Sequence, residues 1–389
     1  MTSPWLRWSA FLFALFHIYC NVFASISELW LSAIHFGGFG AICMFMANEL
    51  LTDGKKSPQY WINVVLALLA MATAAYLLLF ENALYARETE YIASDYAFSI
   101  IAIGLAMEFT RRTTGWFMPT LIAVSLSYIL FLGRYIGGVF AFPGLSLETV
   151  MYRSYFTSEG MFGLTANISS TFVFMFIIFG AFLLKSGAGD FIVRLANCLT
   201  RRLTGGAGLV SVVGSGLMGS VTGSAVANTV SIGVITIPMM KKSGFTPRFA
   251  AGVEAAASTG GALMPPVMGA GAFVLASYTQ ISYLTVIAAS ALPALLYFLT
   301  VSYFVRIEAK RLGMTPVQDG EGESVRTVLK EGWHFIIPLS VLIGLLISGR
   351  TPTSSAAFAI LSVIAASWLS TTPMKLQDIF DAVVDGVRN

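Results

Sequence analysis

Polar side chains that could bind ions gather in one otherwise apolar part of the chain, between Gly205 and Tyr278. Its first half is expected to turn back on itself, and hydroxyls, an amide and glycine lie at the turn. Non-helical backbone inside a membrane is tolerated only where it is buried in protein or lines a cavity. Such a tip can offer oxygens to a cation and helix N-terminal N–H groups to an anion. The residues concerned are Ser220, Thr222, Gly223, Ser224 and Asn228.

Small residues recur at every fourth position in the same stretch. Ser215, Gly219 and Gly223 form one row, and Gly216, Ser220 and Ser224 form a second row. This spacing lets helix backbones approach closely in lipid. Simple packing of two helices explains the rows as well as a binding site does, so the hydroxyl cluster carries more weight than the spacing.

A second interruption follows in the segment STGGALMPP, from Ser258 to Pro266. Tandem proline removes two N–H donors and Gly260-Gly261 removes side-chain bulk, so the helix that starts at Phe249 should unwind before it resumes toward Tyr278. Two broken elements that meet at the middle of the membrane are typical of the ion and substrate sites of secondary transporters. A kinked scaffold helix beside a packed hairpin is the alternative.

Glu254 is an ionisable residue inside an apolar helix, one turn before this break. A charge at the middle of the bilayer is expensive unless it is paired, which makes such a residue a functional candidate. A coupling-ion or proton role is sensible at this position. A structural carboxylate, bonded to a neighbouring helix end or reaching toward the cytoplasmic side, is equally compatible with the sequence.

Composition places the chain in a lipid bilayer. Of its 389 residues, 56% are hydrophobic and only 11% are charged, whereas a soluble domain carries about 25% charged residues. The net charge of +3 is too small and too scattered for a nucleic-acid partner. Three isolated cysteines favour buried small hydrophobes over disulfides or zinc ligands, and three scattered histidines favour packing roles; they are Cys20, Cys43, Cys198, His17, His35 and His334.

Many segments are long and apolar enough to span the membrane as helices, which predicts an all-α polytopic membrane protein. They are Leu6 to Ala24, Trp30 to Leu51, Trp61 to Phe80, Asp95 to Phe109, Phe117 to Gly133, Leu164 to Leu184, Leu284 to Val305, Phe335 to Ser348 and Ser355 to Leu369. Between the spans, Asp190 to Leu203 is predicted to form an amphipathic helix in the cytoplasmic interface, and Pro316 to Glu323 to form a flexible linker. The apolar face of that helix comprises Phe191, Ile192, Leu195, Leu199 and Leu203.

The basic residues of the short loops set the orientation. The pairs Lys55/Lys56, Arg111/Arg112, Arg201/Arg202 and Lys241/Lys242 should all be cytoplasmic. Strict alternation of the spans allows this only if Leu209 to Met240 enters and leaves on the same side. We therefore expect a re-entrant helical hairpin there, with Glu108 paired to Arg111 and Arg112 near a membrane edge.

One segment resembles the hairpin and unwound helix in the large membrane subunit of tripartite ATP-independent periplasmic (TRAP) transporters. Its sequence is GSVTGSAVANTVSIGVITIPMMKKSGFTPRFAAGVEAAASTGGALMPPVMGAGAF. It is most similar to the fused permeases that serve TAXI-type binding proteins. Three flanking stretches resemble the same subfamily: TRRTTGWFMPTLIAVSLSYILFLGRYIGG, SEGMFGLTANISSTFVFMFIIFGAFLLKSGAGDF and EAKRLGM. The resemblance is strong from Phe109 to Gly313 and looser to the C-terminus, and before Phe109 it is one of hydropathy.

The resemblance implies a secondary transporter in the cytoplasmic (inner) membrane of a bacterium or archaeon. A periplasmic TAXI-type binding protein would deliver an organic acid, and an elevator-like motion would carry it inward, coupled to sodium ions or protons and without another cofactor. The matching tip and unwound helix comprise Gly219, Ser220, Thr222, Gly223, Ser224, Asn228, Thr259, Gly260, Gly261, Pro265 and Pro266. Of these, Ser220, Ser224, Asn228 and Thr259 are the expected sodium ligands or their immediate shell.

The family pattern continues through a second, inverted repeat, whereas this chain stops at GVRN. We therefore expect the first half of an inverted-repeat transporter, with the missing repeat in the same or another chain, and no transport by residues 1–389 alone. The expected regions are small-subunit-like helices in 1–115, scaffold helices and the interfacial helix in 116–204, the hairpin and unwound helix in 205–283, and further scaffold helices with a cytoplasmic linker near 313–332 in 284–389.

Two other functional classes are weighed against a carrier. An intramembrane enzyme would need a nucleophile, an Asp-rich or a His/Asp constellation on adjacent helices, and the sequence has none. A passive channel needs a charged or carbonyl-lined filter, which the hairpin could mimic. An ion-coupled anion carrier without a binding protein is the remaining alternative.

Overall fold

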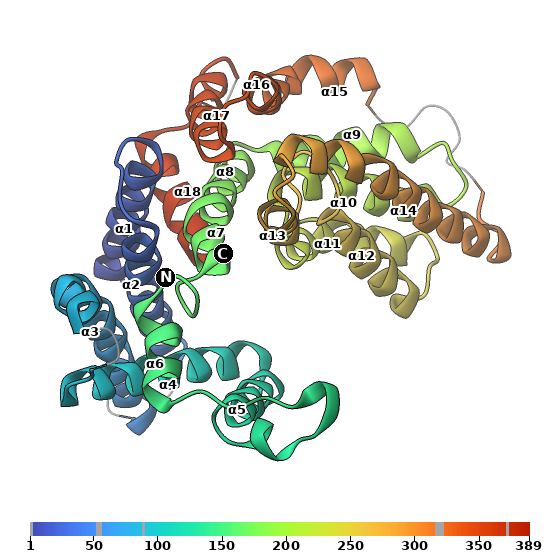
Figure 1. The fold of residues 1–389 in the computed structure, drawn as a ribbon. Coiled ribbons are helices and arrows are strands. Elements are labelled where there is room, and N and C mark those ends of the chain that lie inside the picture. Colours follow the sequence, from blue (N-terminus) through green and yellow to red (C-terminus); the bar gives the residue numbers. More distant parts are fainter. Residues whose placement is uncertain (1–2, 52–56, 88–89, 316–322, 371–372) are drawn as a thin grey trace. The chain divides into compact units, whose positions relative to one another are not determined.

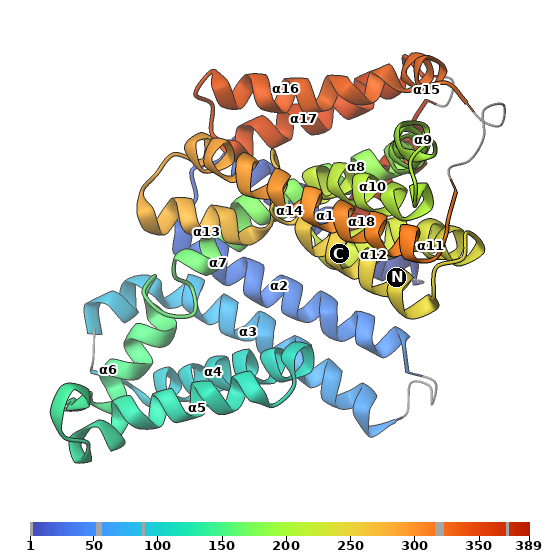
Figure 2. The same ribbon diagram turned by 90° about the vertical axis from the view of Figure 1, so that its right-hand side faces the viewer.

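The computed structural model describes residues 3–51, 57–87, 90–315, 323–370 and 373–389, and these residues are helical with connecting loops. They form two compact units, residues 1–170 and residues 171–389 (Figures 1 and 2). The predicted basic pair Lys55/Lys56 and the predicted linker from Pro316 to Glu323, apart from Glu323 itself, lie outside the described residues. The all-helical prediction is confirmed.

The first unit contains five long helices and several short ones. The long helices are α1 (Pro4–Val22), α2 (Glu28–Glu49), α3 (Pro58–Arg87), α4 (Ala93–Thr114) and α5 (Phe117–Leu130). The short ones are η1 (Leu132–Tyr135), η2 (Gly138–Phe140), α6 (Leu147–Met151), the π-helical turn η3 (Tyr152–Phe156) and α7 (Leu164–Ile168). Helices α2, α3 and α4 run side by side in Figure 2.

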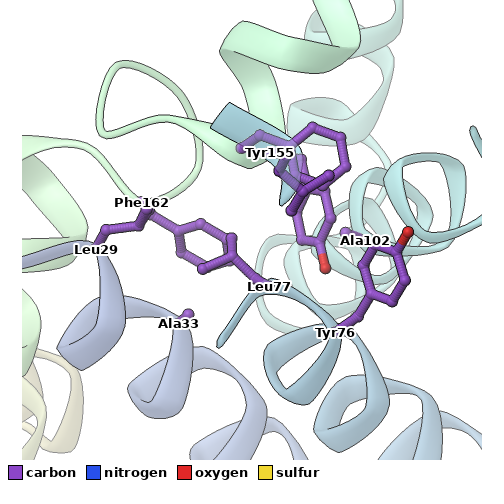
Figure 3. Close-up of a cluster of buried hydrophobic side chains, with 9 residues drawn as sticks. Leu29, Ala33, Tyr76, Leu77, Ala102, Tyr155 and Phe162 are labelled. Carbon is purple, nitrogen blue, oxygen red and sulfur yellow. The ribbon is translucent and has the colours of Figure 1, made fainter. Parts of the chain in front are cut away.

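A buried apolar cluster joins these helices. Figure 3 shows Leu29 and Ala33 of α2 beside Leu77 of α3, with Tyr155 and Phe162 between the helices. The Tyr155 hydroxyl donates a 2.5 Å hydrogen bond to the carbonyl of Thr73, so the buried ring has a partner for its polar end. In lipid such clusters hold helices together by close packing and not by burial from water.

The second unit begins within the π-helical turn η4 (Ser169–Val173), at Thr171. Its helices are α8 (Phe174–Lys185), α9 (Ala188–Thr200), α10 (Gly206–Thr222), α11 (Ala225–Lys242), α12 (Pro247–Gly261), α13 (Ala270–Thr279), α14 (Tyr283–Arg311), α15 (Val325–Gly332), η5 (Trp333–Phe335), α16 (Ile336–Ile347), α17 (Pro352–Ser367) and α18 (Leu376–Arg388). Hydroxyl side chains cap several of them. Thr246 accepts from the Phe249 N–H at the start of α12, and Ser282 accepts from the Thr285 N–H at the start of α14.

The described helices include five that are long and apolar enough to cross a membrane. They cover Glu28–Glu49, Pro58–Arg87, Leu164–Lys185, Tyr283–Arg311 and Val325–Ile347. All nine predicted spans are helical over most of their length, with shifted ends: the span predicted to reach Gly133 is helical in α5 only to Leu130, and α14 runs past Val305 to Arg311. The protein is therefore a polytopic helical membrane protein.

The predicted hairpin and the predicted break are both present. Helices α10 and α11 pack against each other on either side of a two-residue turn at Gly223-Ser224. Arg201, before α10, and Ser243, after α11, line one pocket of about 200 Å³, so the open ends of the hairpin lie together. Helix α12 ends at Gly261 and the chain becomes helical again only at Ala270. Which side of the membrane the open ends face stays a prediction.

The amphipathic helix α9 differs in detail from its prediction. It buries Ala188, Ile192, Ala196 and Thr200, whereas Leu199 and Leu203, predicted on the same face as Ile192, are exposed. The Arg194 guanidinium, on the polar side, bonds Glu323 at 2.8 Å and Glu331 of α15 at 2.6 Å. The apolar contacts of α9 are therefore made mainly near its start, where Phe191 packs on the ring of Phe335 and Ile192 joins a buried cluster with Met218 and Ile232.

Two predictions about single residue types are corrected. Cys43 is exposed and Cys198 is half-buried, because both lie on outward helix faces; Cys20 alone of the three is buried as predicted. His17 and His35 were predicted as unrelated packing residues, yet the His17 Nε2 and His35 Nδ1 atoms lie 3.2 Å apart. Their rings meet because α1 and α2 pack together, a contact between helices that the sequence separation of 18 residues does not reveal.

Candidate functional site

The turn of the hairpin is built around Gly223. This residue has a φ of +62°, in the left-handed region that favours glycine. A Cβ atom at Gly223 would lie 1.9 Å from the carbonyl oxygen of Met268, so the absence of a side chain is also needed for packing. Ser224 then caps α11 by accepting from the Ala227 N–H at 3.3 Å. The tip therefore lies directly against the segment that follows the break in α12.

The end of α12 packs closely on α10. A Cβ atom on Gly219 would lie 2.2 Å from the Cα atom of Gly261, and one on Gly260 would lie 2.3 Å from the ring of Tyr297. Gly219, Gly260 and Gly261 thus allow the hairpin and α14 to approach the backbone of α12. Figures 1 and 2 show α10, α11 and α12 next to one another.

The unwound segment after α12 is held to the hairpin tip by hydrogen bonds. The Val267 N–H donates to the carbonyl of Ser220 at 3.2 Å. The Tyr283 hydroxyl lies within 2.9 Å of the Pro266 carbonyl oxygen and 2.6 Å of the Val267 carbonyl oxygen. The Pro265-Pro266 peptide bond is cis. The predicted tip and break are therefore in contact, through Gly219 with Gly261, Ser220 with Val267 and Gly223 with Met268.

The predicted hydroxyl ligands differ in their surroundings. Ser220 donates to the carbonyl of Leu217 at 2.7 Å, and Thr222 donates to that of Met218 at 3.2 Å. Thr259 donates to the carbonyl of Ala255 at 2.8 Å and is exposed. A hydroxyl that donates in this way keeps its lone pairs available as acceptors. Thr222 and Ser224 also line a cavity of about 40 Å³ beside Gly180 of α8.

Asn228 is the most informative of the predicted ligands. It is fully buried, and its Nδ2 atom donates to the carbonyl of Ser215 at 2.8 Å. Because a carbonyl oxygen can only accept, this bond fixes which end of the amide is which. The Oδ1 atom has no hydrogen-bond partner among the described residues. A buried acceptor without a partner costs about 1–3 kcal/mol, so a bound water or cation would stabilise this site.

Glu254 lies at the centre of the three-helix contact and is fully buried. Its Oε2 atom accepts from Ser211 at 2.6 Å and from Thr236 at 2.5 Å. Its Oε1 atom accepts from Ser215 and Ser258, each at 3.0 Å. The four hydroxyls come from α10, α11 and α12, so this carboxyl group connects both arms of the hairpin to the broken helix.

The two predicted carboxylates can be compared with these contacts. Hydroxyl groups of three helices enclose Glu254, and its functional role stays a prediction. Glu108 is paired as predicted, with 2.7 Å contacts from Arg111 Nε to its Oε2 atom and from Arg112 Nε to its Oε1 atom.

Sequence reasoning missed the four hydroxyl partners of Glu254. One signal was available for some of them. Ser258 follows Glu254 by four residues, and Ser215 follows Ser211 by four residues, so each pair lies on one helix face. Thr236 gives no such signal, because its contact depends on how α11 packs against α12.

Comparison with known proteins identifies the family of this chain. The family profile for the tripartite ATP-independent periplasmic transporter, DctM component, matches residues 101–389. The chain is 28% identical over 250 residues to the C4-dicarboxylate TRAP transporter large permease protein DctM of Vibrio cholerae, covering 61% of this chain and 54% of that protein.

Two other relatives are named for different substrates. The sialic acid TRAP transporter large permease protein SiaM of Vibrio cholerae is 27% identical over 266 residues, covering 67% of this chain and 61% of that protein. The ectoine/5-hydroxyectoine TRAP transporter large permease protein UehC of Ruegeria pomeroyi is 25% identical over 253 residues, covering 65% of this chain and 57% of that protein. The chain thus spans little more than half the length of these curated relatives. Since the profile covers most of the chain, the protein belongs to the DctM family of TRAP transporter large permeases.

Proposed function

We propose that this chain acts in a secondary transporter that carries an organic acid inward, driven by a sodium or proton gradient and supplied by a periplasmic binding protein. Family membership supports transport, and two relatives are named for C4-dicarboxylate and sialic acid, which supports a carboxylate substrate. The TAXI type of binding protein, the elevator-like motion and the four-region division of the chain rest on the sequence resemblance. That resemblance also puts the rest of the transport site in a second repeat, in this polypeptide or another.

The observation that carries the proposal is the buried Asn228 amide at the contact between the hairpin and the end of α12. Its Oδ1 atom has no partner among the described residues, and Asn amide oxygens are suitable ligands for hard cations such as sodium. Ser220 and Ser224 lie at the same tip. Thr259 follows Glu254 by five residues on α12 and is exposed, so it is the weakest of the four predicted ligands.

The test is uptake by the full permease in vesicles with its binding protein. Replacing Asn228 by Ala should raise the sodium concentration needed for half-maximal uptake at least tenfold. This corresponds to the loss of about one good ligand, or roughly 1.4 kcal/mol. Thr229→Ala is the matched control, because Thr229 is the next residue on α11 and donates to its own helix at Ala225. The control should behave like the unmodified permease.

Three results would count against the proposal. Unchanged sodium dependence in Asn228→Ala would remove this residue from the cation site. Non-saturating current down the ion's own gradient would indicate a channel. Uptake that is the same with and without the binding protein would indicate a different kind of carrier.

A further inference from the structure

The Glu254 carboxyl group has as many hydrogen-bond donors as an ionised carboxylate can accept. A carboxylate offers about four lone-pair positions, and four hydroxyls occupy them: Ser211, Ser215, Thr236 and Ser258. Distances of 2.5 and 2.6 Å at Oε2 are typical of hydroxyl bonds to a charged oxygen. The hydrogen bonding of the ionised form is therefore complete.

The negative charge of that form, in contrast, has no cationic partner among the residues that the structure describes. The helices packed against α12 are α10, α11 and α14. Helix α10 carries no ionisable side chain, and the charged residues of α11 and α14 lie near their ends: Lys241, Lys242, Arg306, Glu308, Lys310 and Arg311. Tyr297 of α14 donates to the Ala256 carbonyl, and Arg248 of α12 is exposed. A buried charge without a partner is costly, so binding a cation here is favoured.

A proton fits this site better than a metal ion. The hydroxyl groups direct their protons at the carboxylate, so their lone pairs face away from it. The packing is also close, because a Cβ atom at Gly233 would lie 3.0 Å from the Glu254 Cγ atom. A proton needs no additional volume.

The protonated form can also satisfy its hydrogen bonds. Thr236 Oγ1 lies 3.1 Å from the carbonyl oxygen of Ile232 as well as 2.5 Å from Glu254 Oε2. When Oε2 carries a proton, that proton can be donated to Thr236, and the Thr236 hydroxyl can turn to donate to Ile232. The other three hydroxyls keep their bonds. Proton binding therefore requires one hydroxyl rotation and no movement of a helix.

We propose that Glu254 is a reversible proton-binding site that couples proton movement to transport. This inference rests on the proposed transport function, and it adds a proton site separate from the cation site at Asn228. Water on one side of the membrane supplies the proton to Oε2 and water on the other side receives it, so the carboxyl group is regenerated. Since Thr236 belongs to α11 and Glu254 to α12, protonation reverses the hydrogen bond between the second arm of the hairpin and the broken helix.

Infrared spectroscopy of the purified full permease tests this without substrate or gradient. On lowering the pH, every Asp and Glu side chain that takes up a proton adds C=O absorption, so the spectra are compared by difference. One component of this absorption, present in the unmodified protein, should be missing in Glu254→Gln. Asp95→Asn is the matched control, because Asp95 is also a fully buried carboxyl group. The control should keep this component. Thr236→Val keeps Glu254 but removes one of its hydrogen-bond partners, so it should shift the frequency of the Glu254 C=O band. This variant replaces Glu254→Gln in the test if Glu254→Gln does not fold.

The same C=O absorption in the unmodified protein and in Glu254→Gln at every pH, or a Glu254 component that does not change with pH, would overturn the proton site. These results are independent of the uptake assay. A permease that shows the titrating band but no gradient-driven uptake would contradict the transport function and leave the proton site intact.

Discussion

Asp95 in the first unit and Glu254 in the second are both fully buried carboxyl groups, yet their partners differ in kind. Asp95 contacts the Arg87 guanidinium at 2.9 Å, the Tyr76 hydroxyl at 2.6 Å and the Ile92 N–H at 3.1 Å. Glu254 contacts four hydroxyls and no cation among the described residues. An ion pair fixes the charge of Asp95 and fastens α3 to α4, whereas hydroxyls can accommodate either charge state of Glu254.

The largest expected effect comes from removing the cation of the first carboxyl group. Arg87→Ala leaves Asp95 charged and buried without its partner, and should reduce the free energy of unfolding by about 3 kcal/mol. Thermal unfolding in detergent measures this change. The double variant Arg87→Ala/Asp95→Asn should recover part of the loss. An unaffected single variant would show that Asp95 does not depend on its ion pair.

A smaller effect is expected from disturbing the close packing that brings the hydroxyls to Glu254. Gly219→Ala places a Cβ atom 2.2 Å from Gly261, so α10 and α12 must separate. Overpacking of this kind should cost about 2 kcal/mol and should also reduce uptake. Gly252→Ala is the control, because Gly252 is exposed on α12 and a Cβ atom there has open space. Equal stability of the two variants would contradict the packing argument.

The two carboxyl groups also show where sequence reasoning succeeds. The break after α12 was predicted correctly from glycine and proline, because proline removes a backbone donor and glycine allows conformations that other residues avoid. The hairpin was predicted from the positions of the basic pairs in the loops. Glu254 could be singled out because a charge inside an apolar helix is costly wherever the helix lies. The amphipathic and apolar periodicities likewise predicted most helices.

Partners that depend on packing could not be predicted. Glu254 meets Ser211 across 43 positions and Thr236 across 18, and these contacts depend on the crossing of three helices. Asp95 was read only as the start of a span, and its pairing with Arg87 across the loop was missed. The contact between His17 and His35 was missed for the same reason. Local sequence limits where a helix begins and ends, but not which faces meet.

The central claim is that Glu254, unlike Asp95, changes its charge during transport. The most direct test compares two modes of transport by the full permease carrying Glu254→Gln, which mimics the protonated form. Exchange of labelled for unlabelled substrate needs no proton movement, and should stay within about twofold of the unmodified permease, a difference of roughly 0.4 kcal/mol. Net uptake driven by a pH gradient should fall at least tenfold, or roughly 1.4 kcal/mol. Net uptake that keeps its rate and its pH dependence in this variant would contradict the claim.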